Sequence, residues 1–168
     1  MSTTLIKNGK VISSTGVIAQ DVLLDGETIR ALGAPGYFTE EGMDRVIDAA
    51  GKYVIPGGID VHTHMELPFG GTFASDTFET GSLAAAWGGT TTIIDMAVQR
   101  YGEDVHAGLA EWHRKAEEQC AIDYAFHQII GGVDDESLKA MKYLTEHEGI
   151  SSFKLFMAYP GVFYSDDG

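Results

Sequence analysis

Two histidines one residue apart, His62 and His64, are the residues whose types and spacing most directly suggest chemistry. They end a largely apolar segment, residues 59–62, which predicts a β-strand. Side chains alternate between the two faces of a strand, so both imidazoles can reach one metal ion while Thr63 points away. A catalytic zinc site normally takes at least three protein ligands. A metal site here therefore needs a further ligand from elsewhere in the chain.

Lys154 is the residue that can supply this ligand. The residues around it, Phe153, Leu155, Phe156 and Met157, are large and apolar. Burial of an unpaired ammonium group is costly and favours the neutral amine. A neutral lysine can add carbon dioxide to form a carbamate, an anionic ligand that can bridge two metal ions. A lysine at a strand end that extends into solvent is the alternative, and this segment alone leaves both open.

From residue 53 the chain alternates between predicted strands and helices. The first predicted strand region consists of residues 53–55 and 59–62, interrupted by Pro56-Gly57-Gly58, and the later predicted strands are residues 90–95, 122–130 and 151–157. The predicted helices are residues 76–87, 104–119 and a third that begins at Asp134 or Asp135 and stops near Gly149. This order predicts a parallel sheet, either doubly wound or part of a (β/α)8 barrel. Functional groups gather at the carboxyl ends of the strands in both architectures, which is where we expect His62, His64, Asp95 and Lys154.

Local signals set the expected helix boundaries and buried faces. Asp76 is the expected N-cap of the first helix, with Glu79 three residues on, and Gly88-Gly89 is its expected stop. The spacing of apolar residues predicts one buried face on each of the next two helices. These residues are Val105, Leu109, Trp112 and Ala116 in the second helix, and Leu138, Met141 and Leu144 in the third. We expect Asp95 only to cap a helix or loop.

Residues 1–52 predict a small antiparallel β unit, separate from the unit of alternating strands and helices expected over residues 53–168. Asn8-Gly9 predicts a hairpin between residues 5–7 and 10–12. Asp25-Gly26 predicts a second hairpin between residues 22–24 and 28–30. A further brief strand is expected at residues 45–48. Nothing in this unit suggests catalysis.

Composition limits the classes of function. The chain has 168 residues with 11 basic and 25 acidic side chains, which gives a formal charge of −14. Such a surface repels nucleic-acid phosphates and anionic lipid. Cys120 is the only cysteine, which excludes an internal disulfide framework and fits a reducing cytoplasm. We also expect no signal peptide and no membrane span, because no apolar run approaches roughly 20 residues.

Three segments resemble the dihydropyrimidinases, or D-hydantoinases, within the cyclic amidohydrolases. They are residues 56–71 (PGGIDVHTHMELPFGG), 87–95 (WGGTTTIID) and 152–159 (SFKLFMAY). The similarity covers nearly the whole chain, including the β-rich start. Dihydroorotases and allantoinases share the His-x-His pair but usually continue differently. The MELPFGG continuation therefore favours the dihydropyrimidinase branch.

The resemblance implies an α/β fold, with the first half of a TIM barrel preceded by part of a β-sandwich-like domain. It also implies two divalent metal ions, and the expected metal is Zn²⁺. His62 and His64 would bind the more buried ion, and carbamylated Lys154 would bridge both. Tyr159 would hydrogen-bond the substrate carbonyl. The apolar residues implied for the substrate pocket are Leu67, Phe69, Phe156 and Phe163.

The implied activity is hydrolysis of a small cyclic amide. Rings of 5,6-dihydropyrimidines or 5-substituted hydantoins would open to N-carbamoyl amino acids, and the full-length protein would be a homotetramer. In the family, two further histidines and an aspartate come from later strands. His106, His113, His127 and His147 do not stand at those positions and are expected to be structural. The 168-residue chain is therefore expected to be an inactive fragment, with a non-catalytic scaffold or an allantoinase-like amidohydrolase as alternatives.

Overall fold

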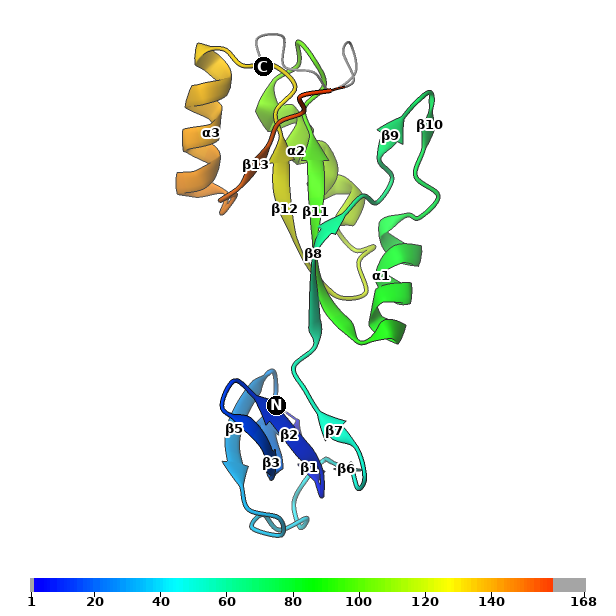
Figure 1. The fold of residues 1–168 in the computed structure, drawn as a ribbon, viewed down its shortest axis with the longest axis vertical. Helices are drawn as coiled ribbons and strands as arrows, with labels where there is room; N and C mark the ends of the chain where they lie inside the picture. Colours follow the sequence, from blue (N-terminus) through cyan, green and yellow to red (C-terminus); the bar gives the residue numbers. More distant parts are fainter. Residues whose placement is uncertain (1, 159–168) are drawn as a thin grey trace. The chain divides into compact units, whose positions relative to one another are not determined.

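The chain divides into two compact units, Met1–Pro56 and Gly57–Gly168, in a computed structural model that describes residues 2–158 (Figure 1). The N-terminal unit contains seven strands in two sheets, of order β5-β4-β1-β6 and β3-β2-β7. Their bounds are β1 (Thr3–Lys7), β2 (Lys10–Ser13), β3 (Gly16–Ala19), β4 (Asp21–Asp25), β5 (Thr28–Gly33), β6 (Arg45–Asp48) and β7 (Tyr53–Val54). The unit is mixed rather than wholly antiparallel, because β6 pairs with β1 and β7 pairs with β2 in parallel.

One of the two predicted hairpins is wrong. The strands beside Asn8-Gly9 exist, but β1 and β2 pair in different sheets. Asn8 has φ of 63°, whereas Gly9 is not among the residues with positive φ, so the pair does not form the type I′ turn of a two-residue hairpin. A Cβ at Gly9 would lie 2.5 Å from Cγ2 of Val54, so close packing of β7 requires a glycine there. The hairpin around Gly26 is confirmed, since β4 and β5 are antiparallel neighbours.

The second unit is built on a parallel sheet of order β13-β12-β11-β8. Its strands are β8 (Gly58–Thr63), β11 (Thr90–Val98), β12 (Asp123–Ile129) and β13 (Phe153–Lys154), and a small hairpin joins β9 (Pro68–Phe69) to β10 (Thr72–Phe73). The helices are α1 (Phe78–Gly88), α2 (Val105–Ala116) and α3 (Asp135–His147). Consecutive strands are neighbours throughout, with none of the strand-order reversal of a doubly wound sheet among the described residues. This is the order of the first strands of a barrel.

Helices α1 and α2 pack against β11, and α2 also contacts α1 and α3 (Figure 1). The predicted buried face of α2 is confirmed, because Val105, Leu109, Trp112 and Ala116 are all buried. The prediction for α3 is only partly right. Leu138 is 53% exposed, and the buried face consists of Ser137, Ala140 and Leu144.

Several element boundaries differ from the predictions. The N-cap of α1 is Thr77, whose side chain forms a reciprocal capping box with Thr80, rather than Asp76. Strand β11 continues to Val98, so Asp95 lies inside the strand and does not end it. Tyr53–Val54 pairs with β2 instead of opening the parallel sheet. The fourth strand is limited to Phe153–Lys154, although Lys154 does lie at its carboxyl end. No helix in the described part of the chain is long and apolar enough to cross a bilayer.

Candidate metal centre

His62 and His64 converge at the carboxyl end of β8. Their Nε2 atoms are 3.1 Å apart, and their ring planes meet at 76°. Two imidazole nitrogens on one tetrahedral zinc ion, each bonded at about 2.0–2.1 Å, are separated by about 3.3 Å. The pair is therefore spaced to bind one ion of this kind. Within residues 2–158, no group of three or more His, Cys, Asp or Glu side chains is arranged to hold a metal ion.

A β-bulge underlies this arrangement. Asp60 pairs with Ile93 and Thr63 pairs with Asp95, so Val61 and His62 together lie opposite Ile94 alone. Bulges bend the strand and redirect side chains, and they are common beside active sites. Simple alternation along an ideal strand correctly predicted that the two imidazoles meet. It did not predict the extra residue through which β8 achieves this.

Asp95 holds the residues on both sides of His64, through the Thr63 side chain and the Met65 backbone. It is fully buried, and its Oδ2 accepts hydrogen bonds from Thr63 Oγ1 at 2.7 Å and from the Met65 backbone N–H at 2.8 Å. Its Oδ1 accepts from the indole Nε1 of Trp112 in α2 at 2.9 Å. The expectation that Asp95 merely caps a helix or loop is wrong. A carboxylate within the apolar run of β11 was the signal that could have revealed this role.

Lys154 is partly buried at the end of β13, with Nζ 4.7 Å from the centre of the Phe156 ring. Burial lowers the pKa of the Lys154 ammonium group. The pKa of His64 is also lowered, first by burial and then by the positive charge of Lys154, with His62 adding to this and Asp95 opposing it. Both shifts favour the neutral forms, which are the forms that can bind metal or, for lysine, add carbon dioxide. Nδ1 of His64 is buried and has no hydrogen-bond partner among the described residues.

A cavity of about 340 Å³ lies beside Lys154 on the sheet. It is lined by Met96, His127, Ser152, Phe153, Lys154 and Leu155. His127 lies in β12, within the strand predicted at residues 122–130, where it was expected to be structural. It bonds to the Val61 carbonyl at 2.9 Å and to the Ser152 hydroxyl, so it contacts the segments that carry His62 and Lys154.

The residues expected to shape a substrate pocket lie in different surroundings. Leu67 and Phe156 are partly buried and pack against the hydrophobic core of the second unit. Phe69 is 45% exposed in the β9–β10 hairpin. Tyr159 and Phe163 lie outside the described residues.

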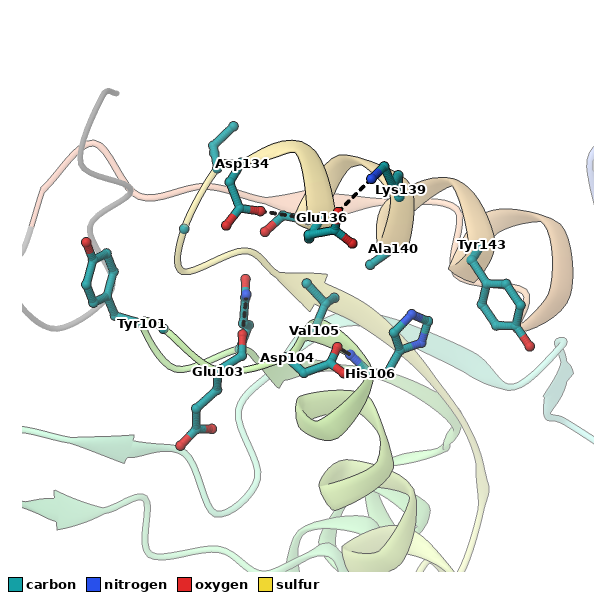
Figure 2. Close-up of a pocket in the computed structure, with 15 residues that line it drawn as sticks. Tyr101, Glu103, Asp104, Val105, His106, Asp134, Glu136, Lys139, Ala140 and Tyr143 are labelled. Carbon is teal, nitrogen blue, oxygen red and sulfur yellow. Dashed lines mark hydrogen bonds and ion pairs between the residues drawn. The ribbon is translucent and has the colours of Figure 1, made fainter.

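A larger cavity, of about 860 Å³, lies away from these groups, where β11 and β12 lead into α2 and α3 (Figure 2). None of the residues that line it is His62, His64 or Lys154. Its carboxylates have local partners: Asp104 accepts the His106 backbone N–H at 2.9 Å, and Asp134 accepts the Ser137 backbone N–H at 2.7 Å. These are helix N-caps. The His, Asp and Glu side chains of this lining are not arranged in a group of three or more that could hold a metal ion.

The remaining histidines are occupied in local contacts. His106 meets the Tyr143 ring edge-on with ring centres 5.1 Å apart, and His113 contacts Phe126 in the same way at 4.9 Å. His147 stacks on Tyr143 and bonds to its carbonyl through Nδ1 at 3.1 Å.

Comparison with known proteins finds relatives that match nearly the whole of this chain. The chain is 59% identical to a D-hydantoinase from Streptomyces coelicolor, over 99% of this chain and 36% of that protein. It is 39% identical to a dihydropyrimidinase from Rattus norvegicus, over 97% of this chain and 32% of that protein. The crystal structure of dihydropyrimidinase from Brevibacillus agri matches with a TM-score of 0.92 and 44% identity, over 98% of this chain and 35% of that one.

These matches confirm the α/β fold and its relation to the TIM-barrel hydantoinases. The chain spans about a third of the length of these relatives. Residues 53–147 match the model of the amidohydrolase family, which in general uses divalent metal ions. This match includes β8 with its histidine pair, Asp95 in β11, and His127 in β12. The chain belongs to the amidohydrolase family.

Proposed function

We propose that His62, His64 and Lys154 form the first part of the metal centre of a cyclic amide hydrolase of the dihydropyrimidinase and hydantoinase type. The observation that carries this proposal is the 3.1 Å separation of the two Nε2 atoms at the carboxyl end of a parallel strand. Names of the relatives, D-hydantoinase and dihydropyrimidinase, support the choice of substrate class. The substrates would be 5,6-dihydropyrimidines or 5-substituted hydantoins, which open to N-carbamoyl amino acids.

Lys154 would enter this centre as a carbamate. The neutral amine attacks carbon dioxide, a C–N bond forms, and one proton leaves the nitrogen, so the product is an anionic –NH–COO⁻ group. The lowered pKa of Lys154 supports this step, because it increases the fraction of neutral amine. Two imidazole nitrogens and a carboxylate-like group suit Zn²⁺, and we propose two such ions bridged by the carbamate.

When bound, such ions lower the pKa of a water molecule and polarise an amide carbonyl. The chain's own residues would orient the ring and stabilise charge. Tyr159 would donate a hydrogen bond to the carbonyl oxygen as negative charge develops on it. The apolar side chains proposed to contact the ring's exocyclic substituent are Leu67, Phe69, Phe156 and Phe163.

We propose that the 168-residue chain by itself does not hydrolyse these substrates. By the family resemblance, two further histidines and an aspartate of the metal centre would come from later strands. This chain spans only 36% of the length of the Streptomyces relative. We further propose that the full-length protein is a homotetramer. A cytoplasmic location is proposed because the sequence has only one cysteine.

Metal binding by the purified chain tests the proposal. After equilibrium dialysis against Zn²⁺, we expect about one bound equivalent by elemental analysis, and His62→Ala or His64→Ala should abolish it. His147→Ala is the matched control, since it removes a histidine from the surface of α3. If the wild-type chain binds no Zn²⁺, or if the two variants bind as much Zn²⁺ as the wild type, the proposal is contradicted and a non-catalytic scaffold is favoured.

A test of the substrate class requires a protein with a complete active site. A chimera that joins these 168 residues to the remainder of the Streptomyces coelicolor D-hydantoinase should hydrolyse dihydrouracil or a 5-substituted hydantoin. The same chimera with Lys154→Met should be inactive. Turnover of allantoin in preference to both ring types would overturn the assignment of substrate.

A further inference from the structure

His127 connects two strands that are not neighbours. It lies in β12 opposite Met96 of β11, and its side chain is partly buried. Its Nε2 is 2.9 Å from the carbonyl oxygen of Val61 in β8, and its Nδ1 is hydrogen-bonded to Oγ of Ser152, just before β13. The imidazole therefore links the residue preceding His62 to a residue two positions before Lys154.

The hydrogen-bond roles of His127 follow from its partners. A carbonyl oxygen can only accept, so Nε2 carries the hydrogen and donates it to Val61. In the neutral imidazole Nδ1 is then an acceptor, and the Ser152 hydroxyl donates to it. Both ring nitrogens are used in these two bonds. His127 consequently has no free nitrogen for a metal ion in this arrangement.

The bond to Val61 falls at the bulge in β8. Val61 and His62 share one partner residue on β11, so Val61 lies outside one-to-one pairing. A carbonyl displaced in this way needs another donor, and His127 supplies it. Since the same bulge carries His62, the donor bond restrains the backbone that aims the His62 ring. The Ser152 bond extends this restraint to the segment that leads into Lys154.

We propose that His127 is a positioning residue that sets the distance between the His62–His64 pair and Lys154. It acts through Val61 and Ser152 and does not itself bind metal. This inference rests on the metal centre proposed above. Its two hydrogen bonds hold the ring in one orientation, and the pairing of β12 with β11 fixes its position in the sheet.

Metal affinity of the purified chain tests this role. Competition with a chromophoric chelator gives the dissociation constant for Zn²⁺, and the absorption spectrum of bound Co²⁺ reports ligand geometry. We expect His127→Ala to raise the dissociation constant 10- to 100-fold, the range for groups that orient metal ligands, and to change the Co²⁺ spectrum. His127→Gln keeps an amide donor for Val61 and should restore affinity to within about threefold.

Two further variants separate positioning from general stability. Ser152→Ala removes only the second bond and should raise the dissociation constant less than His127→Ala does. His147→Ala removes a surface histidine and should leave the constant unchanged. Circular dichroism and urea unfolding in the presence of chelator identify any variant that does not fold. If His127→Ala does not fold, the Zn²⁺ affinities of His127→Gln and Ser152→Ala test the proposal.

The outcomes are distinguishable. If the wild-type chain binds no Zn²⁺, the proposed metal centre fails and this inference falls with it. If the wild type binds Zn²⁺ and the folded His127 variants bind it with the same affinity and Co²⁺ spectrum, the positioning role alone is overturned. Loss of affinity in His127→Ala with recovery in His127→Gln supports it.

Discussion

The carboxylate of Asp95 accepts the hydroxyl hydrogen of Thr63 at 2.7 Å, and Thr63 is the residue between the two converging histidines. The same oxygen accepts the backbone N–H of Met65, so the residues on either side of His64 are held by one buried group. Trp112 anchors the other carboxylate oxygen from α2. The histidine pair is thus joined to the helical layer through Asp95.

Asp95→Asn should lower the free energy of unfolding by about 2–3 kcal/mol, because an amide group cannot accept at both oxygen positions and one buried donor loses its charged partner. Urea unfolding of the purified chain measures this. Asp123→Asn is the control, since Asp123 is exposed at the start of β12 and should change stability by less than about 0.5 kcal/mol. Equal effects in the two variants would contradict a special role for Asp95.

Lys154→Met should stabilise the metal-free chain at neutral pH. Burial lowers the pKa of Lys154, so the unfolded chain holds its proton more tightly than the folded chain does. Wild-type stability then rises with pH between the lowered pKa and the ordinary lysine value, and the advantage of methionine shrinks over that window. Urea unfolding at several pH values in chelator measures the difference. An advantage that grows with pH would show that the sign is wrong.

The imidazole of His64 should titrate at a higher pH in Lys154→Met than in the wild type. Burial remains in the variant, but the positive charge that is the second cause of the lowered pKa is removed. NMR titration of the metal-free chain reports both values. An unchanged His64 pKa would mean that Lys154 does not act on it.

Gly108→Ala should destabilise the chain by about 1–3 kcal/mol. A Cβ at this position in α2 would lie 2.4 Å from the carbonyl oxygen of Val98, which belongs to the strand backbone. The helix would have to move away from β11, the strand that carries Asp95. Gly88→Ala in α1 is the matched control, because its Cβ meets nothing within 4 Å and its φ is not positive. Urea unfolding should therefore show a neutral or slightly stabilising change for Gly88→Ala.

Local pattern was enough to predict several parts of this protein. The buried face of α2 follows from apolar spacing, and the end of α1 follows from Gly88-Gly89, where Gly89 adopts φ of 89°. The convergence of His62 and His64 follows from strand alternation and their one-residue separation. These features depend on neighbours in the chain, so their period and residue types are visible in the sequence.

The features that local pattern did not predict depend on pairing between segments far apart in the sequence. Asn8-Gly9 resembles a hairpin turn, but β1 pairs with β4 and β6 and joins a different sheet from β2. The bulge at Val61 appears only when β8 is placed in register with β11. Asp95 and His127 acquire their roles through partners 30 or more residues away, at Thr63, Met65 and Val61.

The sequence by itself determined which residues are candidates to bind a metal ion and at which end of their own strands they lie, because side-chain chemistry and position along a strand are local properties. The tertiary structure alone determined what holds those residues in place. A buried carboxylate or imidazole is stable only when its hydrogen bonds are made, and the donors and acceptors come from strands that folding brings together.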